Sequence, residues 1–333
     1  MKKKFDAIDS IKGFMIALFS YFLLTFILSI ILMVSSKKLN DLSYITQNLL
    51  SMVLELSFLS CLIFVKKDKD LKYALKLDKK PKLIPSLICL CIGIVILFGF
   101  LSFNNLFLFL LQKTGYNTST GESLVAQNIG EFLITILSAA VTPAICEEFL
   151  FRGVCYNGLK EKGNKFAIIV SGLMFMIMHM NLTQSIYQFV LGIIFAIVVY
   201  ITGSLWYSMI MHFFNNAFIL VVTYALKSVE SGENTEIFKS FFDYILPFLL
   251  LGIAIYVVYL LLKKLKTYFP CDNSSNDNNE IISDNLTSYT NFMDKQELNY
   301  TSPKRMSFKS SFITCSIIAI IIYIIAVISG FSN

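Results

Sequence analysis

The feature that most constrains this chain is a series of apolar runs, each about twenty residues long or longer. They recur along the sequence and few breakers interrupt them, because 333 residues include only 6 Pro but 31 Phe. A run of 18 or more mostly apolar residues is long enough to cross a bilayer as a helix. A helix also pairs its own backbone polar groups, which lipid requires. The sequence therefore predicts an all-α, polytopic transmembrane helix bundle.

The composition supports a membrane protein and argues against a nucleic-acid-binding one. Hydrophobic residues make up 56% of the chain and charged residues only 15%, whereas a soluble domain has about 25% charged residues. The net charge of +6 is concentrated in short loops, where it indicates orientation rather than a nucleic-acid partner. The seven cysteines form no C-x-x-C pair, so we expect buried thiols and neither disulfides nor a zinc knuckle.

The apolar runs predict nine membrane helices, which form an eight-helix core plus one additional C-terminal span. The first run is too long for a signal peptide and no small-residue cleavage site follows it, so it is taken as a retained span. The expected helices are 13–34, 44–65, 83–111, one from about 131, 166–180, 185–201, 205–226, 241–262 and 311–328. Four regions follow: 1–130 with the first three helices, a catalytic core at 131–262, a disordered polar linker at 263–310, and the last span at 311–333.

The distribution of basic residues predicts the orientation. With the N-terminus inside, 22 Lys and Arg fall on inner segments and 5 in outer loops, with Arg152 inside a helix. Cytoplasmic loops carry this excess, so the N-terminus is expected in the cytoplasm. The polar stretch 112–130 is read as a plain external loop, with a substrate gate as the alternative.

Three ionisable residues lie inside the fourth apolar run, where charge is costly. Glu147, Glu148 and Arg152 follow Pro143, which is expected to kink the helix. A charged side chain at mid-membrane costs at least about 2.5 kcal/mol, so such residues are functional candidates. Glu148 and Arg152 are four residues apart and share a helix face, where they can pair. Glu147 is rotated off that face and needs another partner.

The two histidines of the chain lie in later apolar helices. His179 follows Phe175 by four residues, and His212 precedes Asn216 by four, which puts the last two on one helix face. Singly, each could make a helix-packing hydrogen bond. Together with the acidic pair they favour one shared polar pocket, because lipid offers no water to satisfy them.

These residues resemble the three-motif signature of the CPBP intramembrane endopeptidases, which include the type II CAAX-processing proteases and the bacteriocin-immunity (Abi) proteins. The matching motifs are Glu147-Glu148-x-x-x-Arg152, Phe175-x-x-x-His179 and His212-x-x-x-Asn216, and the resemblance covers about residues 127–260. It implies a hydrolase of a membrane-associated peptide or protein, working in the lipid bilayer. The composition suggests a bacterial cell membrane.

The chemistry expected of the pocket is hydrolysis by an activated water. Glu147 suits the general base, His179 would help hold the water, and His212 with Asn216 would donate to the oxyanion. Glu148 and Arg152 would pair and fix the helix. No metal is favoured, but zinc stays open, held by Glu147, His179 and His212. Two other functions remain open: a non-catalytic bacteriocin self-immunity or binding protein, and a proton-coupled transporter.

Overall fold

The computed structural model describes residues 4–65, 69–118, 126–226, 241–270 and 307–331. Within these ranges the chain forms helices and connecting turns, with no strand. Eight of the helices are long and apolar enough to cross a membrane. The all-α, polytopic fold expected from the sequence is therefore confirmed.

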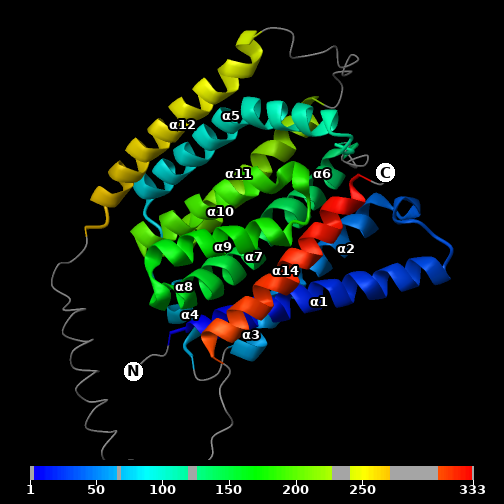
Figure 1. The fold of residues 1–333 in the computed structure, drawn as a ribbon, viewed down its shortest axis with the longest axis horizontal. Coiled ribbons are helices and arrows are strands. Elements are labelled where there is room, and N and C mark those ends of the chain that lie inside the picture. The colour runs from blue at the N-terminus through cyan, green and yellow to red at the C-terminus, as the bar shows by residue number, and fades with distance from the viewer. Residues whose placement is uncertain (1–3, 66–68, 119–125, 227–240, 271–306, 332–333) are drawn as a thin grey trace, which may run out of the picture.

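Long helices make up most of the bundle (Figure 1). They are α1 (Ala7–Val34), α2 (Tyr44–Leu56) continued by the 3₁₀ turn Ser57–Leu59 and α3 (Ser60–Val65), α5 (Leu83–Lys113), α10 (Leu182–Thr202), α11 (Leu205–Leu226), α12 (Phe241–Thr267) and α14 (Phe308–Ser329). Shorter elements are the 3₁₀ turn Leu39–Asp41, α4 (Leu71–Ala74) and α9 (Asn164–Met178). The motif helix runs from Ile129 to Lys162 in several segments.

Two details differ from the nine-span prediction. The helix α9 has 15 residues, about 22 Å at 1.5 Å per residue, which is shorter than the hydrocarbon core of about 30 Å. The predicted linker 263–310 is helical at both ends, since α12 continues to Thr267 and α14 begins at Phe308. Its middle, 271–306, lies outside the described residues. The orientation and the division into four regions stay predictions.

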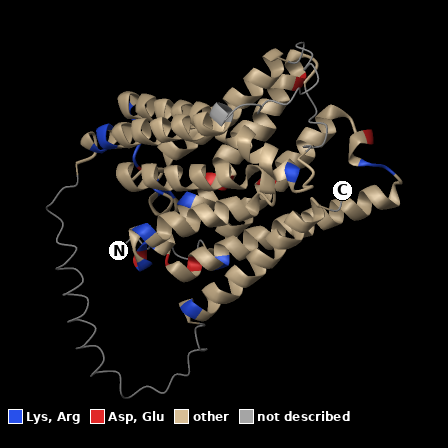
Figure 2. Ribbon diagram, turned by 45° about the horizontal axis from the view of Figure 1, so that its top comes forward, with Lys and Arg blue, Asp and Glu red and all other residues tan. Residues whose placement is uncertain are grey.

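The helices pack in antiparallel and crossed pairs around the motif helix. α12 lies along α5, α9 along α10, and α14 crosses beside α1, which brings the last span against the first (Figure 1). Most Lys and Arg lie toward the helix ends, whereas some acidic residues lie within the middle of the bundle (Figure 2). Large apolar side chains such as Phe19 and Ile63, 67% and 75% exposed, cover the outer surface. This is the surface expected of a bundle that faces lipid.

The motif helix is interrupted by two π-helical segments. α6 (Ile129–Ile136) leads into the π segment Leu137–Val141, then α7 (Thr142–Glu148), a second π segment Phe149–Tyr156, and α8 (Asn157–Leu159) with a final 3₁₀ turn. Pro143 stands at the start of α7. It has no N–H for the carbonyl four residues earlier, so the regular hydrogen-bond ladder breaks there. The kink expected at Pro143 is thus realised as a widened turn before it.

The first helix stabilises the second π segment. Ser10 of α1 donates its hydroxyl toward the carbonyls of Val154 and Cys155, at 3.1 and 2.9 Å. The close approach needs Gly158, because a Cβ there would stand 2.1 Å from the Ser10 Oγ atom. The irregular backbone of the motif helix is therefore paired by polar groups of its neighbour.

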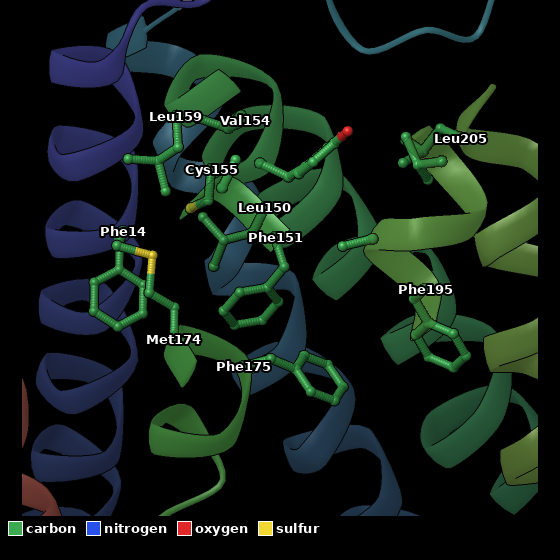
Figure 3. Packing of buried hydrophobic residues seen from close by; sticks show 14 of the residues in the cluster. Phe14, Leu150, Phe151, Val154, Cys155, Leu159, Met174, Phe175, Phe195 and Leu205 are labelled. Carbon is green, nitrogen blue, oxygen red and sulfur yellow. The ribbon is translucent and has the colours of Figure 1, made fainter. Parts of the chain in front are cut away.

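A dense aromatic and aliphatic core lies behind the motif helix (Figure 3). The Phe151 ring contacts Phe14 of α1 and Phe175 of α9, with ring centroids 6.5 and 5.1 Å apart. Of the six described cysteines, Cys91 is exposed and the other five are buried free thiols. The thiol prediction is confirmed for those five; Cys271 lies outside the described residues.

Candidate active site

A cavity of about 600 Å³ lies between several helices of the bundle. It is lined by α2, α5, the π segment before α7, α7 itself, the turn after α9, and the facing sides of α10 and α11. All four residues expected to act on a substrate line it: Glu147, His179, His212 and Asn216. Three segments far apart in the sequence thus bring their polar groups to one place, as the shared-pocket hypothesis required.

A fully buried ion pair stands behind the cavity. The Arg152 guanidinium donates from Nη1 to Glu148 Oε1 at 2.6 Å, and both side chains have no exposed surface. Its Nη2 donates to the Gly192 carbonyl of α10 at 3.1 Å. The pairing of Glu148 with Arg152 is as predicted. It also ties the motif helix to α10.

Aromatic rings enclose the guanidinium. Its central carbon lies 4.4 Å from the Phe175 ring centroid and 5.0 Å from that of Phe195. A cation over a ring face is attracted by the ring quadrupole, and more strongly where water is excluded. Phe175 also contacts both imidazoles, with centroids 4.8 Å from His179 and 5.9 Å from His212. This phenylalanine therefore spaces the two histidines as well as holding the cation.

The hydrogen bonds of His212 fix its tautomer. Its Nδ1 lies 3.0 Å from Glu148 Oε1. That oxygen already accepts from Arg152, so we assign the proton between them to Nδ1. The other nitrogen, Nε2, lies 3.8 Å from Glu147 Oε2, too far for a hydrogen bond. Nε2 therefore faces the remaining carboxylate of the motif.

His179 is held in the same tautomer by a different partner. Its Nδ1 lies 2.9 Å from the backbone carbonyl of Phe175. A carbonyl only accepts, so Nδ1 carries the proton and the neutral ring has its lone pair on Nε2. The residue is the cap that follows α9, where the chain turns toward α10. A helix end thus places this acceptor at the cavity.

Asn216 is part of a chain of amide hydrogen bonds. Its Nδ2 donates to the Ala139 carbonyl at 3.1 Å. This is the carbonyl four residues before Pro143, which the proline cannot satisfy. Asn215 donates to Asn216 Oδ1 at 3.2 Å and accepts from the Tyr187 hydroxyl at 2.6 Å. Asn215 thus contacts the neighbouring helix α10 and also lines the cavity.

Sequence reasoning missed one acidic residue of the cavity. Glu55 of α2 lines it together with Glu147, and their carboxyl groups lie close enough to interact electrostatically. The Oε2 atoms of both side chains are buried and have no hydrogen-bond partner among the described residues. The signal was available, because Glu55 is an ionisable residue inside an apolar run.

The zinc set considered from the sequence does not assemble in this geometry. In the part of the chain that the structure describes, no three His, Cys, Asp or Glu side chains lie close enough to hold a metal ion. We derive no chemical step through a metal.

The fold and the cavity define a polytopic helical membrane protein with an acid-, imidazole- and amide-lined interior site. Residues 129–218 match the sequence model described as "Type II CAAX prenyl endopeptidase Rce1-like". Over 91 residues, or 27% of this chain, the sequence is 32% identical to the "Putative membrane peptidase YdiL" of Bacillus subtilis (strain 168), of which the alignment spans 37%. This segment is therefore similar in sequence to proteases of the CPBP/CAAX type. All the motif residues fall inside it.

Proposed function

We propose that this protein is an intramembrane endopeptidase that hydrolyses a peptide bond of a membrane-associated peptide or protein. One observation carries the proposal: Glu147, His179, His212 and Asn216 line a single cavity inside a membrane bundle. The similarity of residues 129–218 to such proteases supports it. The cytoplasmic N-terminus and the bacterial cell membrane belong to the same proposal, on the distribution of Lys and Arg and on the composition.

Water activation falls to Glu147 and His179. The Oε2 atom of Glu147 has no hydrogen-bond partner among the described residues, so it is free to accept a proton. The Nε2 atom of His179 has its lone pair available, because Nδ1 donates to the Phe175 carbonyl. A water held between them attacks the scissile carbonyl carbon, Glu147 takes its proton, and that proton passes to the leaving amine.

Stabilisation of the oxyanion falls to His212 and Asn216. Since Nδ1 of His212 donates to Glu148, a second proton on Nε2 makes this ring a charged donor. Asn216 Nδ2 carries two hydrogens, and only one is needed for the Ala139 carbonyl. Removing one such donor typically lowers kcat by about 10²- to 10³-fold. Glu148 and Arg152 hold His212 in place and do not touch the substrate.

The test is a panel of variants of the full chain, reconstituted in lipid vesicles with a library of membrane-embedded peptides. Glu147→Gln and His179→Ala should abolish cleavage, and His212→Ala and Asn216→Ala should reduce it by at least about 100-fold. The exposed Glu161 gives the control, Glu161→Gln, which should cleave normally.

Two other outcomes would assign another function. A binding or immunity protein would retain peptide or partner binding and its protective effect in the Glu147→Gln variant. A proton-coupled transporter would instead show proton flux that Glu147→Gln stops. In either case wild-type protein would release no cleaved peptide.

A further inference from the structure

Two acidic residues and no lysine or arginine stand among the described residues that line the cavity. The acidic residues are Glu55 on α2 and Glu147 on α7. Arg152 is the buried cation nearest in the sequence, but its guanidinium donates to Glu148 and Gly192 and lies against the rings of Phe175 and Phe195. Among the described lining residues, the imidazole rings of His179 and His212 are thus the basic groups that these two carboxyl groups share the cavity with.

Both carboxyl groups have unused hydrogen-bonding capacity. Glu147 is 6% exposed, and its Oε2 atom and that of Glu55 are buried without a partner among the described residues. A buried acceptor without a donor costs about 1–3 kcal/mol, and more when it is charged. Such groups are rare in native structures, and a catalytic role or a bound partner is one explanation for them. In the proposed mechanism the Glu147 Oε2 atom accepts a hydrogen bond from the attacking water. The Glu55 Oε2 atom has no role in that step and still lacks a partner.

The surroundings of Glu55 suit a positively charged side chain. Ser51, one helical turn earlier on α2, and the side-chain oxygens of Asn104 and Gln188 line the same cavity and can accept hydrogen bonds. Leu97 and Leu101 of α5 add an apolar wall. An ammonium or guanidinium group on an alkyl stem needs this combination, since the stem packs on apolar surface while the head pairs with a carboxylate.

We infer that Glu55 is a specificity-determining residue that receives a cationic group of the substrate, so that the cavity selects peptides carrying a positive charge near the bond that is cut. This inference rests on the proposed endopeptidase function. The charge could be a Lys or Arg side chain or a free α-amino group, which share the same chemistry. A C-terminal carboxylate, by contrast, would meet two acidic groups and be repelled.

The experiment compares matched peptides on wild-type protein and on Glu55→Gln, both full-length in vesicles of neutral lipid. One membrane-anchored peptide carries Lys at each tested position in turn and a second carries Met, which has a similar length and no charge. A third pair has a free or an acetylated N-terminus. Equilibrium binding and kcat/KM are measured for every pair, and Glu161→Gln is the control for loss of one acidic charge.

The expected result is a charge preference that depends on Glu55. Wild-type protein and Glu161→Gln should favour the charged peptide of one pair by about 10- to 100-fold, the range for a charge-assisted hydrogen bond. In Glu55→Gln this ratio should fall to about 1. A preference in the Lys pair assigns the charge to a side chain, and one in the acetylation pair assigns it to the N-terminus.

Other outcomes separate the two proposals. The role of Glu55 is overturned if wild type shows no preference for the charged peptide, or if Glu55→Gln shows the same preference as wild type. Either result would be expected if Glu55 and Glu147 only share a proton with each other. If no peptide is cleaved, the endopeptidase proposal fails, and the binding ratio alone then decides whether Glu55 receives a cation.

Discussion

Replacing Arg152 with Met isolates the role of the buried ion pair. The change removes the donor to Glu148, the bond to the Gly192 carbonyl and the cation that contacts the Phe175 and Phe195 rings. A methionine fills much of the same volume, so the main loss is electrostatic. The Glu148 carboxylate stays fully buried, with His212 as its remaining ionisable partner.

The magnitude follows from this geometry. Removing one partner of a buried pair costs about 3–5 kcal/mol, because the other charge is left uncompensated. The folded-to-unfolded ratio should therefore fall by more than about 100-fold. The double variant Glu148→Gln with Arg152→Met removes both charges and should recover most of the lost stability. It should stay inactive, since His212 then loses the carboxylate that orients Nδ1.

The assay is equilibrium unfolding in mixed detergent, followed by the fluorescence of Trp206. This is the single tryptophan of the chain, and its Nε1 donates to the Leu77 carbonyl at 3.2 Å. The matched control is Lys162→Met, which breaks the exposed pair with Glu161 and should cost less than about 1 kcal/mol. Equal losses for Arg152→Met and Lys162→Met, or no recovery in the double variant, would refute the reasoning.

Three further predictions concern packing, the amide chain and pH. A Cβ at Gly192 would stand 2.8 Å from the Gly172 Cα, so Gly192→Ala must separate α9 from α10. The free energy of unfolding should fall by about 1–3 kcal/mol. The control is Gly252→Ala, where a Cβ meets nothing within 4 Å and the protein should not be destabilised. Tyr187→Phe removes the donor at the head of the amide chain and should lower kcat with little effect on KM; equal effects on both would contradict a positioning role. Burial, and then the charge of Lys160, lowers the pKa of Lys76 from 10.5 to about 7. Between pH 7 and 10.5, Lys76 is therefore protonated in the unfolded chain and mostly neutral in the folded protein. The free energy of unfolding should rise with pH in this range, and more steeply in wild type than in Lys76→Met.

The sequence pointed to the residues that share the cavity because membrane burial makes polar residues conspicuous. Apolar neighbours made five residues stand out: Glu147, Glu148, Arg152 and the two histidines. Helical spacing also paired Glu148 with Arg152 correctly. The same rule applied to Glu55 would have added it to the pocket. Helix bounds agreed to within a few residues in most cases, since long apolar runs leave little choice of secondary structure.

Other features depend on tertiary contacts that spacing does not encode. The π segments around α7 are stabilised by partners from elsewhere, such as the Ser10 hydroxyl and the Asn216 amide. Pro143 predicted a break in the helix, but it did not predict which neighbouring residue would donate a hydrogen bond to the Ala139 carbonyl. The shortness of α9 follows from where its ends turn, at Gly163 with φ of 113° and at His179. The roles of Glu55 and Tyr187 required knowing which helices face one another.

The most direct measurement of the central claim is peptide cleavage in water enriched in oxygen-18. If Glu147 activates a water inside the cavity, wild-type protein should place one heavy oxygen in the new carboxylate of the N-terminal fragment at each cleavage. The Glu147→Gln variant should yield no labelled fragment. Cleavage by the Glu147→Gln variant at the wild-type rate, or products without the label, would contradict the account.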